Sequence, residues 1–198
     1  MQNEEHLRYI QQIFDRYLAI DRDSLEQITK HLKLIELPAD SCVLPYGTIA
    51  KKLYLLYRGS VVSCFMDESG KQYHKNIFLE GAFVGSTVSA MDRTPSQFSL
   101  TCIEASSMFE IDYTTFRALI NTDGYFKDFY IQYLEKNWIR DKEEREVAIV
   151  IQEATHRYKS FLEAHPNIES RIPLQLIASH LGITPTQLSR IRKKLTIS

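Results

Sequence analysis

Residues 172–195 constrain the fold of this 198-residue chain more than any other stretch. Four apolar residues there have the spacing of one buried helix face. These residues are Leu174, Ile177, Ala178 and Leu181. Gly182 can take the left-handed conformation that ends a helix, while Thr184 followed by Pro185 is typical of a helix start. The segment therefore predicts a helix, a tight turn and a second helix.

The second predicted helix has one apolar and one polar face. Leu188, Ile191 and Leu195 share the apolar face. The free face carries hydroxyls, an amide and cations, which suit a helix that enters the major groove of DNA. The residues that we expect to contact DNA are Thr184, Thr186, Gln187, Ser189, Arg190, Arg192, Lys193 and Lys194. The alternative is an ordinary helical hairpin with a solvated basic face.

The distribution of charge supports a nucleic-acid partner more than the total does. The formal net charge is −1, which by itself indicates no polyanion. From residue 156 to the end, however, there are seven Lys and Arg residues and only two Glu residues. Cations are thus concentrated around the predicted helix pair, as contact with phosphates requires.

The chain from residue 32 to residue 111 has the texture of a β domain. Its β-rich runs are Ser41–Leu44, Lys52–Tyr57, Ser60–Met66, Gln72–Leu79, Phe83–Val84, Phe98–Ile103 and Ser107–Ile111. Many short strands separated by turn residues predict a sandwich or a small barrel. Asp67–Gly70 is typical of the loop of a hairpin.

Helical patterns flank this region. We expect helices over residues 4–20 and Ser24–His31, with Ser24 as the N-cap, and over Tyr113–Ile120. A long helix starts near Tyr125 and has a wide aromatic face that needs two surfaces to cover it. One surface is the β domain, and the other is the same helix of a second subunit. The alternative is a helix packed only on its own domain.

These patterns predict a β domain with N-terminal helices at residues 1–122, a dimerisation helix at 123–146 and a helix-turn-helix domain at 147–198. The last of these regions is expected to open with a further helix over Val147–Leu162.

Composition argues against several other classes of protein. Cys42, Cys64 and Cys102 are scattered, which favours buried structural thiols in a reducing compartment, with a redox-sensing thiol as the alternative. A cupin-like enzyme would need clustered histidines, but His74 is the only one between residues 32 and 111. We therefore expect no catalytic residue, metal or cofactor. Without a signal segment or a long apolar run, we expect a cytoplasmic protein with no membrane partner.

The order of helix, β region, long helix and helix-turn-helix resembles the Crp/Fnr family of bacterial transcription regulators. The stretches that carry the resemblance are Leu53–Val61, Gly81–Gly85, Glu110–Tyr113 and Ile177–Lys193, the last resembling the branch common in Bacteroidetes. The resemblance implies an α+β fold. Its parts would be an N-terminal double-stranded β-helix of the jelly-roll-like, cyclic-nucleotide-binding type, a dimerisation helix and a C-terminal helix-turn-helix domain.

The resemblance fails where cyclic-nucleotide-binding members hold their ligand. Those members bind the nucleotide through a segment that we call the cassette, whose entry resembles Gly81–Gly85 here. They have a Glu after the last glycine of that entry and, about ten residues on, an Arg that pairs with the phosphate. Here Ser86 follows Gly85, and Ser96 or Gln97 takes the position of the Arg. Because a buried phosphate without a cation is costly, we predict no cAMP binding of the usual kind, unless a shifted register brings in Arg93.

Gly85, Ser86, Thr87, Ser96 and Gln97 form a neutral, hydroxyl-rich patch. They either bind an uncharged ligand or belong to a vestigial loop. In the family, the base-reading positions of the second helix align with Pro185, Thr186, Ser189 and Arg190, and Arg190 would read a guanine.

The sequence thus favours a homodimeric regulator that binds a palindromic operator in double-stranded DNA. Contact with RNA polymerase and an unidentified small-molecule effector both stay open. The alternative is a β-roll module that binds a small molecule or cyclic nucleotide and has little DNA specificity.

Overall fold

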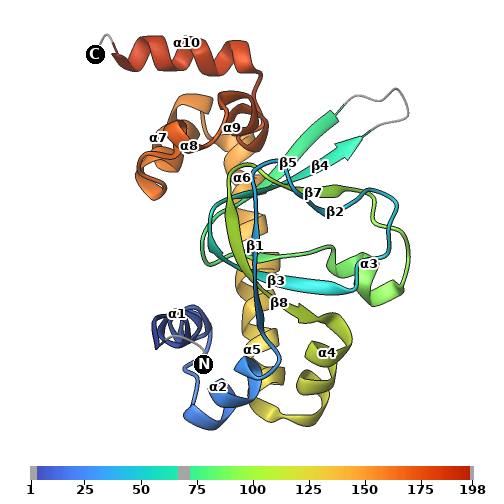
Figure 1. The fold of residues 1–198 in the computed structure, drawn as a ribbon. Coiled ribbons are helices and arrows are strands. Elements are labelled where there is room, and N and C mark those ends of the chain that lie inside the picture. The colour runs from blue at the N-terminus through green and yellow to red at the C-terminus, as the bar shows by residue number, and fades with distance from the viewer. Residues whose placement is uncertain (1–3, 67–71, 197–198) are drawn as a thin grey trace.

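The computed structural model describes residues 4–66 and 72–196 (Figure 1). Two helices, α1 (Glu4–Asp15) and α2 (Arg22–Thr29), precede the strands. The amphipathic α1 buries Ile10, Ile13 and Phe14. The prediction that Ser24 caps α2 is wrong: the Asp21 side chain accepts a hydrogen bond from the Ser24 backbone N–H at 2.8 Å and caps the helix.

Eight strands in the described residues form two antiparallel four-stranded sheets, which together we call the β-roll. Sheet A has the order β1-β8-β3-β6 and sheet B the order β2-β7-β4-β5. The strands are β1 (Lys33–Leu37), β2 (Cys42–Leu44), β3 (Lys52–Arg58), β4 (Val61–Met66), β5 (Gln72–Phe78), β6 (Phe83–Val84), β7 (Ser99–Cys102) and β8 (Ser106–Asp112). The α+β fold and each of the seven predicted β-rich runs are confirmed, whereas β1 was not predicted. The predicted loop Asp67–Gly70 lies outside the described residues, although the strands on either side of it pair.

Successive side chains along a strand point to opposite faces of sheet A, so the sheet takes part in two separate hydrophobic cores. On β3, Leu56 faces sheet B and packs with Val61, Leu100 and Met108. Its neighbour Leu55 belongs to a second core, which the sheet shares with α1 and the helices that follow the β-roll. This second core holds the two N-terminal helices against the β-roll, and the Tyr9 hydroxyl adds a hydrogen bond to the Leu56 carbonyl at 2.6 Å.

The helices after the β-roll lead from one end of the molecule to the other (Figure 1). They are α4 (Tyr113–Thr122), α5 (Gly124–Leu134), the π-helical segment η1 (Glu135–Arg140), α6 (Asp141–Ile151), α7 (Ala154–Ala164), α8 (Ile168–Arg171), α9 (Leu174–His180) and α10 (Pro185–Thr196). A further short helix, α3 (Thr87–Asp92), interrupts the β-roll and was not predicted. The single predicted helix Val147–Leu162 is wrong, because Gln152 leaves the helical conformation and separates α6 from α7.

The long helix of the prediction is therefore α5, η1 and α6 in succession. Phe126 and Phe129 of α5 are fully buried in the core shared with sheet A and α1. Burial of each ring contributes about 1.5–3 kcal/mol. Among the described residues, no helix has both the length and the apolar character that crossing a membrane demands.

Gly59 forms the turn between β3 and β4, and its backbone φ of +99° is one that side chains rarely adopt. A Cβ there would lie 2.3 Å from Ser106 Oγ and 2.8 Å from the Ala105 carbonyl oxygen. By contrast, Gly47 has a φ of +76° with nothing within 4 Å of such a Cβ.

We predict that Gly59→Ala lowers the free energy of unfolding by about 3–5 kcal/mol, because strain and steric overlap add. Gly47→Ala, the matched control, should cost about 1–2 kcal/mol from strain alone. Urea denaturation of both variants measures the difference. Equal losses would contradict the packing that we assign to the Gly59 turn.

Candidate nucleic-acid interface

The C-terminal helices form the predicted helix-turn-helix. Gly182 has a φ of +68°, and its N–H bonds the Ser179 carbonyl at 3.1 Å, which turns the chain after α9. The N–H of Ile183 bonds the Ala178 carbonyl at 3.0 Å. The apolar faces of α9 and α10 meet in a core that also includes Tyr158 and Phe161 of α7.

A reciprocal pair of hydrogen bonds fixes the start of α10. The Gln187 N–H donates to Thr184 Oγ1 at 3.2 Å, and the Thr184 N–H donates to Gln187 Oε1 at 2.9 Å. This capping box confirms Thr184 as the predicted N-cap. The side-chain carbonyl oxygen of Gln187 accepts in this box, and its amide nitrogen is the group that can donate to a phosphate.

The polar face of α10 is exposed as predicted. The exposed residues are Thr184, Pro185, Thr186, Gln187, Ser189, Arg190, Lys193 and Lys194. Arg190 and Lys193 are in no ion pair with any residue of the described ranges 4–66 and 72–196. Figure 1 shows α10 at one extremity of the molecule, on the side away from the β-roll.

Arg192 differs from the other predicted DNA contacts. Its Nε lies 2.7 Å from Glu169 Oε1, and that carboxylate also accepts a hydrogen bond from the Tyr158 hydroxyl. The guanidinium is half-buried and ties α10 to α7 and α8. Arg192 therefore has a structural role within the helix-turn-helix domain, which the sequence pattern alone did not reveal.

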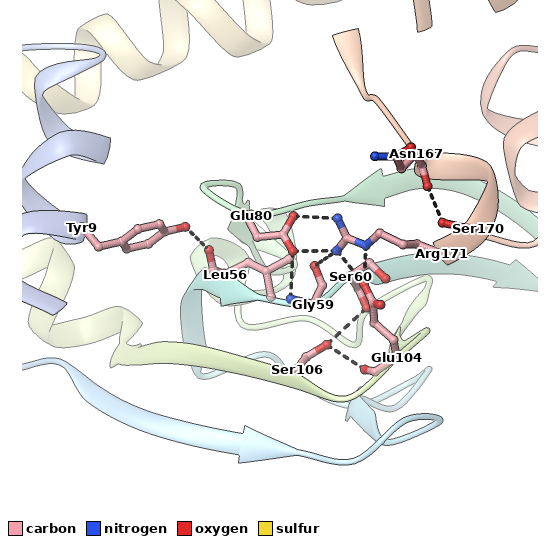
Figure 2. Close-up of polar contacts among 10 residues, drawn as sticks. All are labelled: Tyr9, Leu56, Gly59, Ser60, Glu80, Glu104, Ser106, Asn167, Ser170 and Arg171. Carbon is pink, nitrogen blue, oxygen red and sulfur yellow. Dashed lines mark hydrogen bonds and ion pairs between the residues drawn. The ribbon is translucent and has the colours of Figure 1, made fainter. Parts of the chain in front are cut away.

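One arginine joins the helix-turn-helix domain to the β-roll (Figure 2). Arg171 Nη2 at the end of α8 lies 2.6 Å from both Glu80 Oε1 and Glu104 Oε1. It also donates to the Gly59 carbonyl at 3.3 Å, while Glu80 accepts from the Gly59 N–H at 3.1 Å. We call Arg171, Glu80, Glu104 and Gly59 the Arg171 clamp. No sequence motif singles out these residues, because they come from four separate loops and helix ends.

Electrostatics favour the ionised clamp. Burial acts to raise the pKa of Glu80, but the hydrogen bonds and charge of Arg171, together with backbone hydrogen bonds that include the one from Gly59, lower it by more, so that the pKa lies below its ordinary value of 4.5. The two carboxylates correspondingly raise the pKa of Arg171. Stability from the Glu80 pair is therefore present above pH 4.5 and is lost as the pH falls through the lowered pKa.

Apolar contacts extend the same joint. Val62 of β4 is buried in the core of the helix-turn-helix domain, and Ile77, Leu79 and Ile103 pack against that core. The Ser179 hydroxyl on α9 donates to the His74 carbonyl on β5. The helix-turn-helix domain thus docks directly on sheet B, and the half-buried His74 is part of that contact.

The predicted ligand patch divides in two. Ser86 and Ser96 are buried and their hydroxyl oxygens lie 3.1 Å apart. Ser96 also donates to the Phe98 carbonyl at 2.8 Å. Gln97 is exposed, and Thr87 begins α3.

A cavity of about 180 Å³ between the sheets is lined by Gly85 and Ser86 but not by Arg93, which is exposed at the end of α3. Lys51 and Lys52 lie at its edge, and Lys52 Nζ forms an ion pair with Glu110 at 2.7 Å. Among the described residues, the hydroxyls of Ser86 and Ser96 bond to each other and to the Phe98 carbonyl rather than to a cation.

The cysteines are less uniform than predicted. Cys102 is buried and Cys64 is half-buried, and burial raises the pKa of both thiols. Cys42 is exposed, so the prediction of three buried thiols is wrong at that position. Cys42 begins the short strand β2, along which the residues change from exposed Cys42 to buried Leu44.

Comparison with known proteins identifies the β-roll. Residues 34–123 match the family model of the cyclic nucleotide-binding domain. The proteins described as the cAMP-activated global transcriptional regulator CRP from Salmonella typhimurium and Klebsiella aerogenes are 27% identical over 100 residues. Each match covers 50% of this chain and 48% of the relative, so the chain spans about half the length of the curated relatives it matches.

Solved structures share the fold over more of the chain. The c-di-GMP-responsive regulator CLP of Xanthomonas campestris has a TM-score of 0.65 at 19% identity, covering 89% of this chain and 92% of CLP. FixK2 of Bradyrhizobium japonicum has a TM-score of 0.67 at 16% identity, covering 84% and 85%. The catabolite activator protein of Thermus thermophilus has a TM-score of 0.56 at 16% identity, covering 91% and 85%. These likenesses establish the common fold.

We predict that Arg171→Gln lowers the free energy of unfolding of the helix-turn-helix domain by about 1–2 kcal/mol, because the clamp is partly exposed and screened. Limited proteolysis near Gln152 and thermal melting at pH 7 measure the loss. Arg93→Gln is the matched control and should change neither. The difference between wild type and Arg171→Gln should shrink below pH 4.5, and a difference that does not depend on pH would contradict the role of Glu80.

Proposed function

The chain belongs to the Crp/Fnr family, and from this premise we propose that it is a homodimeric transcription regulator that binds DNA in a sequence-specific way. One observation carries the proposal: α10 is fixed by its capping box and its apolar face, while hydroxyls and cations cover its free face. A buried helix–helix core with an exposed polar recognition face is the requirement for major-groove binding. Such a regulator works in the cytoplasm, where the bacterial chromosome lies.

Roles within α10 follow from reach and chemistry. The Arg190 guanidinium can give two hydrogen bonds to N7 and O6 of guanine, worth about 1–3 kcal/mol of discrimination. Thr186 and Ser189 are short hydroxyl side chains beside it that suit base edges, including the methyl group of thymine. Lys193 and Lys194 near the end of the helix suit phosphates, which position the helix without reading sequence.

We infer that the exposed side of the long helix forms the dimer interface. Ile131, Trp138 and Ile139 are 42–58% exposed although they are large and apolar. Ile131 lies on α5 and Trp138 and Ile139 on η1, whereas Phe126 and Phe129 of α5 are buried against the β-roll. A second copy of this helix would cover the exposed side, and the resulting two-fold symmetry predicts half-sites about one helical turn apart.

The hydroxyl pair Ser86–Ser96 supports a β-roll that does not take cAMP in the usual way. A cyclic phosphate placed there would lose its water and meet no guanidinium. We also propose that the chain belongs to the Bacteroidetes-type branch of the family and that it contacts RNA polymerase as a regulator.

We predict that Arg190→Ala and Lys193→Ala fail in different ways. In selection of bound duplexes from a random pool, the wild type should enrich a two-fold symmetric motif that contains a guanine, and Arg190→Ala should lose that guanine preference. Lys193→Ala should weaken binding to all sequences and reduce the salt slope by about one. Equal losses on every sequence for both variants would overturn the assigned roles.

We predict that Ile139→Glu weakens dimerisation by about a hundredfold, since it removes apolar burial and places a carboxylate in the interface. Sedimentation at micromolar concentration measures the shift from dimer to monomer. Val88→Glu on α3, where Val88 is 57% exposed, is the matched control and should leave the dimer intact. A monomeric wild type, or a dimer unaffected by Ile139→Glu, would contradict the proposed interface.

A further inference from the structure

The cavity between the two sheets of the β-roll has room for a small ligand. Its volume is about 180 Å³. An engineered apolar cavity of roughly 150 Å³ takes up benzene, whereas drug-sized ligands occupy pockets of about 300–1,000 Å³. The cavity therefore fits a compound with one ring. A cyclic purine nucleotide, which has two fused rings, a sugar and a phosphate, is larger than this space.

Most of the lining is apolar and comes from both sheets. Val43 and Leu44 of β2 and Leu100 of β7 belong to sheet B, while Ile49 and Ala50 precede β3 of sheet A. Leu44, Ala50 and Leu100 are at most 9% exposed. Protein interiors are normally close-packed, so buried apolar side chains around a space of this size lack contacts that an apolar ring would supply.

A buried hydroxyl in the wall offers hydrogen bonds to a ligand. Ser86 lines the cavity and is 4% exposed. A serine hydroxyl has one donor and two acceptor sites. The contact with Ser96 uses one of these sites, and Ser96 in turn bonds the Phe98 carbonyl at 2.8 Å. Ser86 therefore keeps two sites for a polar group inside the cavity.

The inner part of the cavity carries no charge. Among the described residues that line it, the charged ones are Lys51 and Lys52, and both lie at the edge. Lys51 is exposed to water, and Lys52 is paired with Glu110 at 2.7 Å. Burial raises the pKa of Tyr54 in the wall, so its phenol is neutral at pH 7. An ionic group deep in the cavity would lose its water and find no partner of opposite charge.

We propose that the cavity binds a small, uncharged compound with one ring, whose hydroxyl group bonds Ser86 and whose ring packs between Val43 and Leu100. The sequence alone leaves open an uncharged ligand or a vestigial loop. A vestigial loop needs neither an apolar space of this volume nor a buried hydroxyl with sites to spare, so the geometry favours the ligand. Binding stands without the proposed function, and an effect of the ligand on DNA affinity would rest on it.

The test compares phenol with toluene, which is the same size but has no hydroxyl group. Ligand-observed NMR titrations of the full chain measure the affinity for each. We expect saturable binding of phenol, at least about tenfold weaker binding of benzoate, and no displacement of phenol by cAMP. Absence of saturable phenol binding, or benzoate binding as tight as that of phenol, overturns the proposal.

A serine variant tests the proposed hydrogen bond. Ser86→Ala should weaken binding of phenol about five- to tenfold and leave that of toluene unchanged, because only phenol loses a partner. Ser99→Ala is the matched control: Ser99 lies on β7, is not in the cavity wall, and bonds the Cys64 carbonyl instead. The ratio of the two affinities should therefore change in Ser86→Ala alone. An equal ratio in both variants contradicts the role of Ser86.

Variants that fill the cavity show where phenol binds. Val43→Phe should reduce the affinity for phenol at least about tenfold, because the added ring occupies the same space. Val88→Phe adds a ring to an exposed position of α3 outside the cavity wall and should bind phenol as the wild type does. Ala50→Leu is the second filling variant if thermal melting shows that Val43→Phe is unfolded. Unchanged affinity in a folded filling variant means that phenol binds elsewhere and overturns the site.

The titrations contain no DNA, so this proposal and the proposed function fail separately. A chain that binds phenol but enriches no duplex would overturn the proposed function and leave the ligand site standing. A chain that enriches an operator but binds no phenol would overturn the ligand site alone.

Discussion

The contact of Arg171 with two carboxylates determines how the two halves of this protein are joined. Glu80 and Glu104 come from different loops of the β-roll, and the Gly59 turn lies between them (Figure 2). A planar guanidinium can satisfy both carboxylates and the Gly59 carbonyl only from a narrow range of directions. The clamp is partly exposed, so its main contribution is to fix geometry rather than to supply a large free energy. The apolar contacts of Val62 with the helix-turn-helix core add the stability that the charges lack.

The features best predicted from the sequence are those that depend only on residues close together in the chain. The turn at Gly182 and the cap at Thr184 depend on residues within one helical turn, and both were predictable. Strand β1 was missed because its residues Lys33–Leu37 are also good helix formers that follow a helix directly, and pairing with β8 decides their conformation. The Arg171 clamp, the ion pair of Arg192 and the π turn could not be predicted, since each depends on side chains that meet only after the chain has folded.

The cassette illustrates how a substitution changes the task of a site without disturbing the fold. By the resemblance, Ser86 takes the position of an acidic residue and Ser96 or Gln97 that of a basic one. Ser86 and Ser96 are buried, and their hydroxyls satisfy each other. Without a ligand, a buried Glu and Arg would keep two charges in an interior of low dielectric constant, which costs free energy. Two hydroxyls cost little with or without a ligand. This cassette is therefore stable when it is empty. Its hydroxyls lack the charge that would make an anionic ligand the preferred occupant.

Unlike the cassette, the long helix leads from the β-roll to the helix-turn-helix domain. Phe126 and Phe129 of α5 pack in the core, whereas Ile131 of α5 and Ile139 of η1 are exposed on the side that we propose for a second copy. Trp138 of η1 is half-exposed beside them. The packed core anchors the start of the long helix, and the Arg171 clamp holds the helix-turn-helix domain that follows its end. Between these two anchors, one place has hydrogen bonds that already depart from α geometry. That place is η1, which lies between the core at α5 and the helix-turn-helix domain.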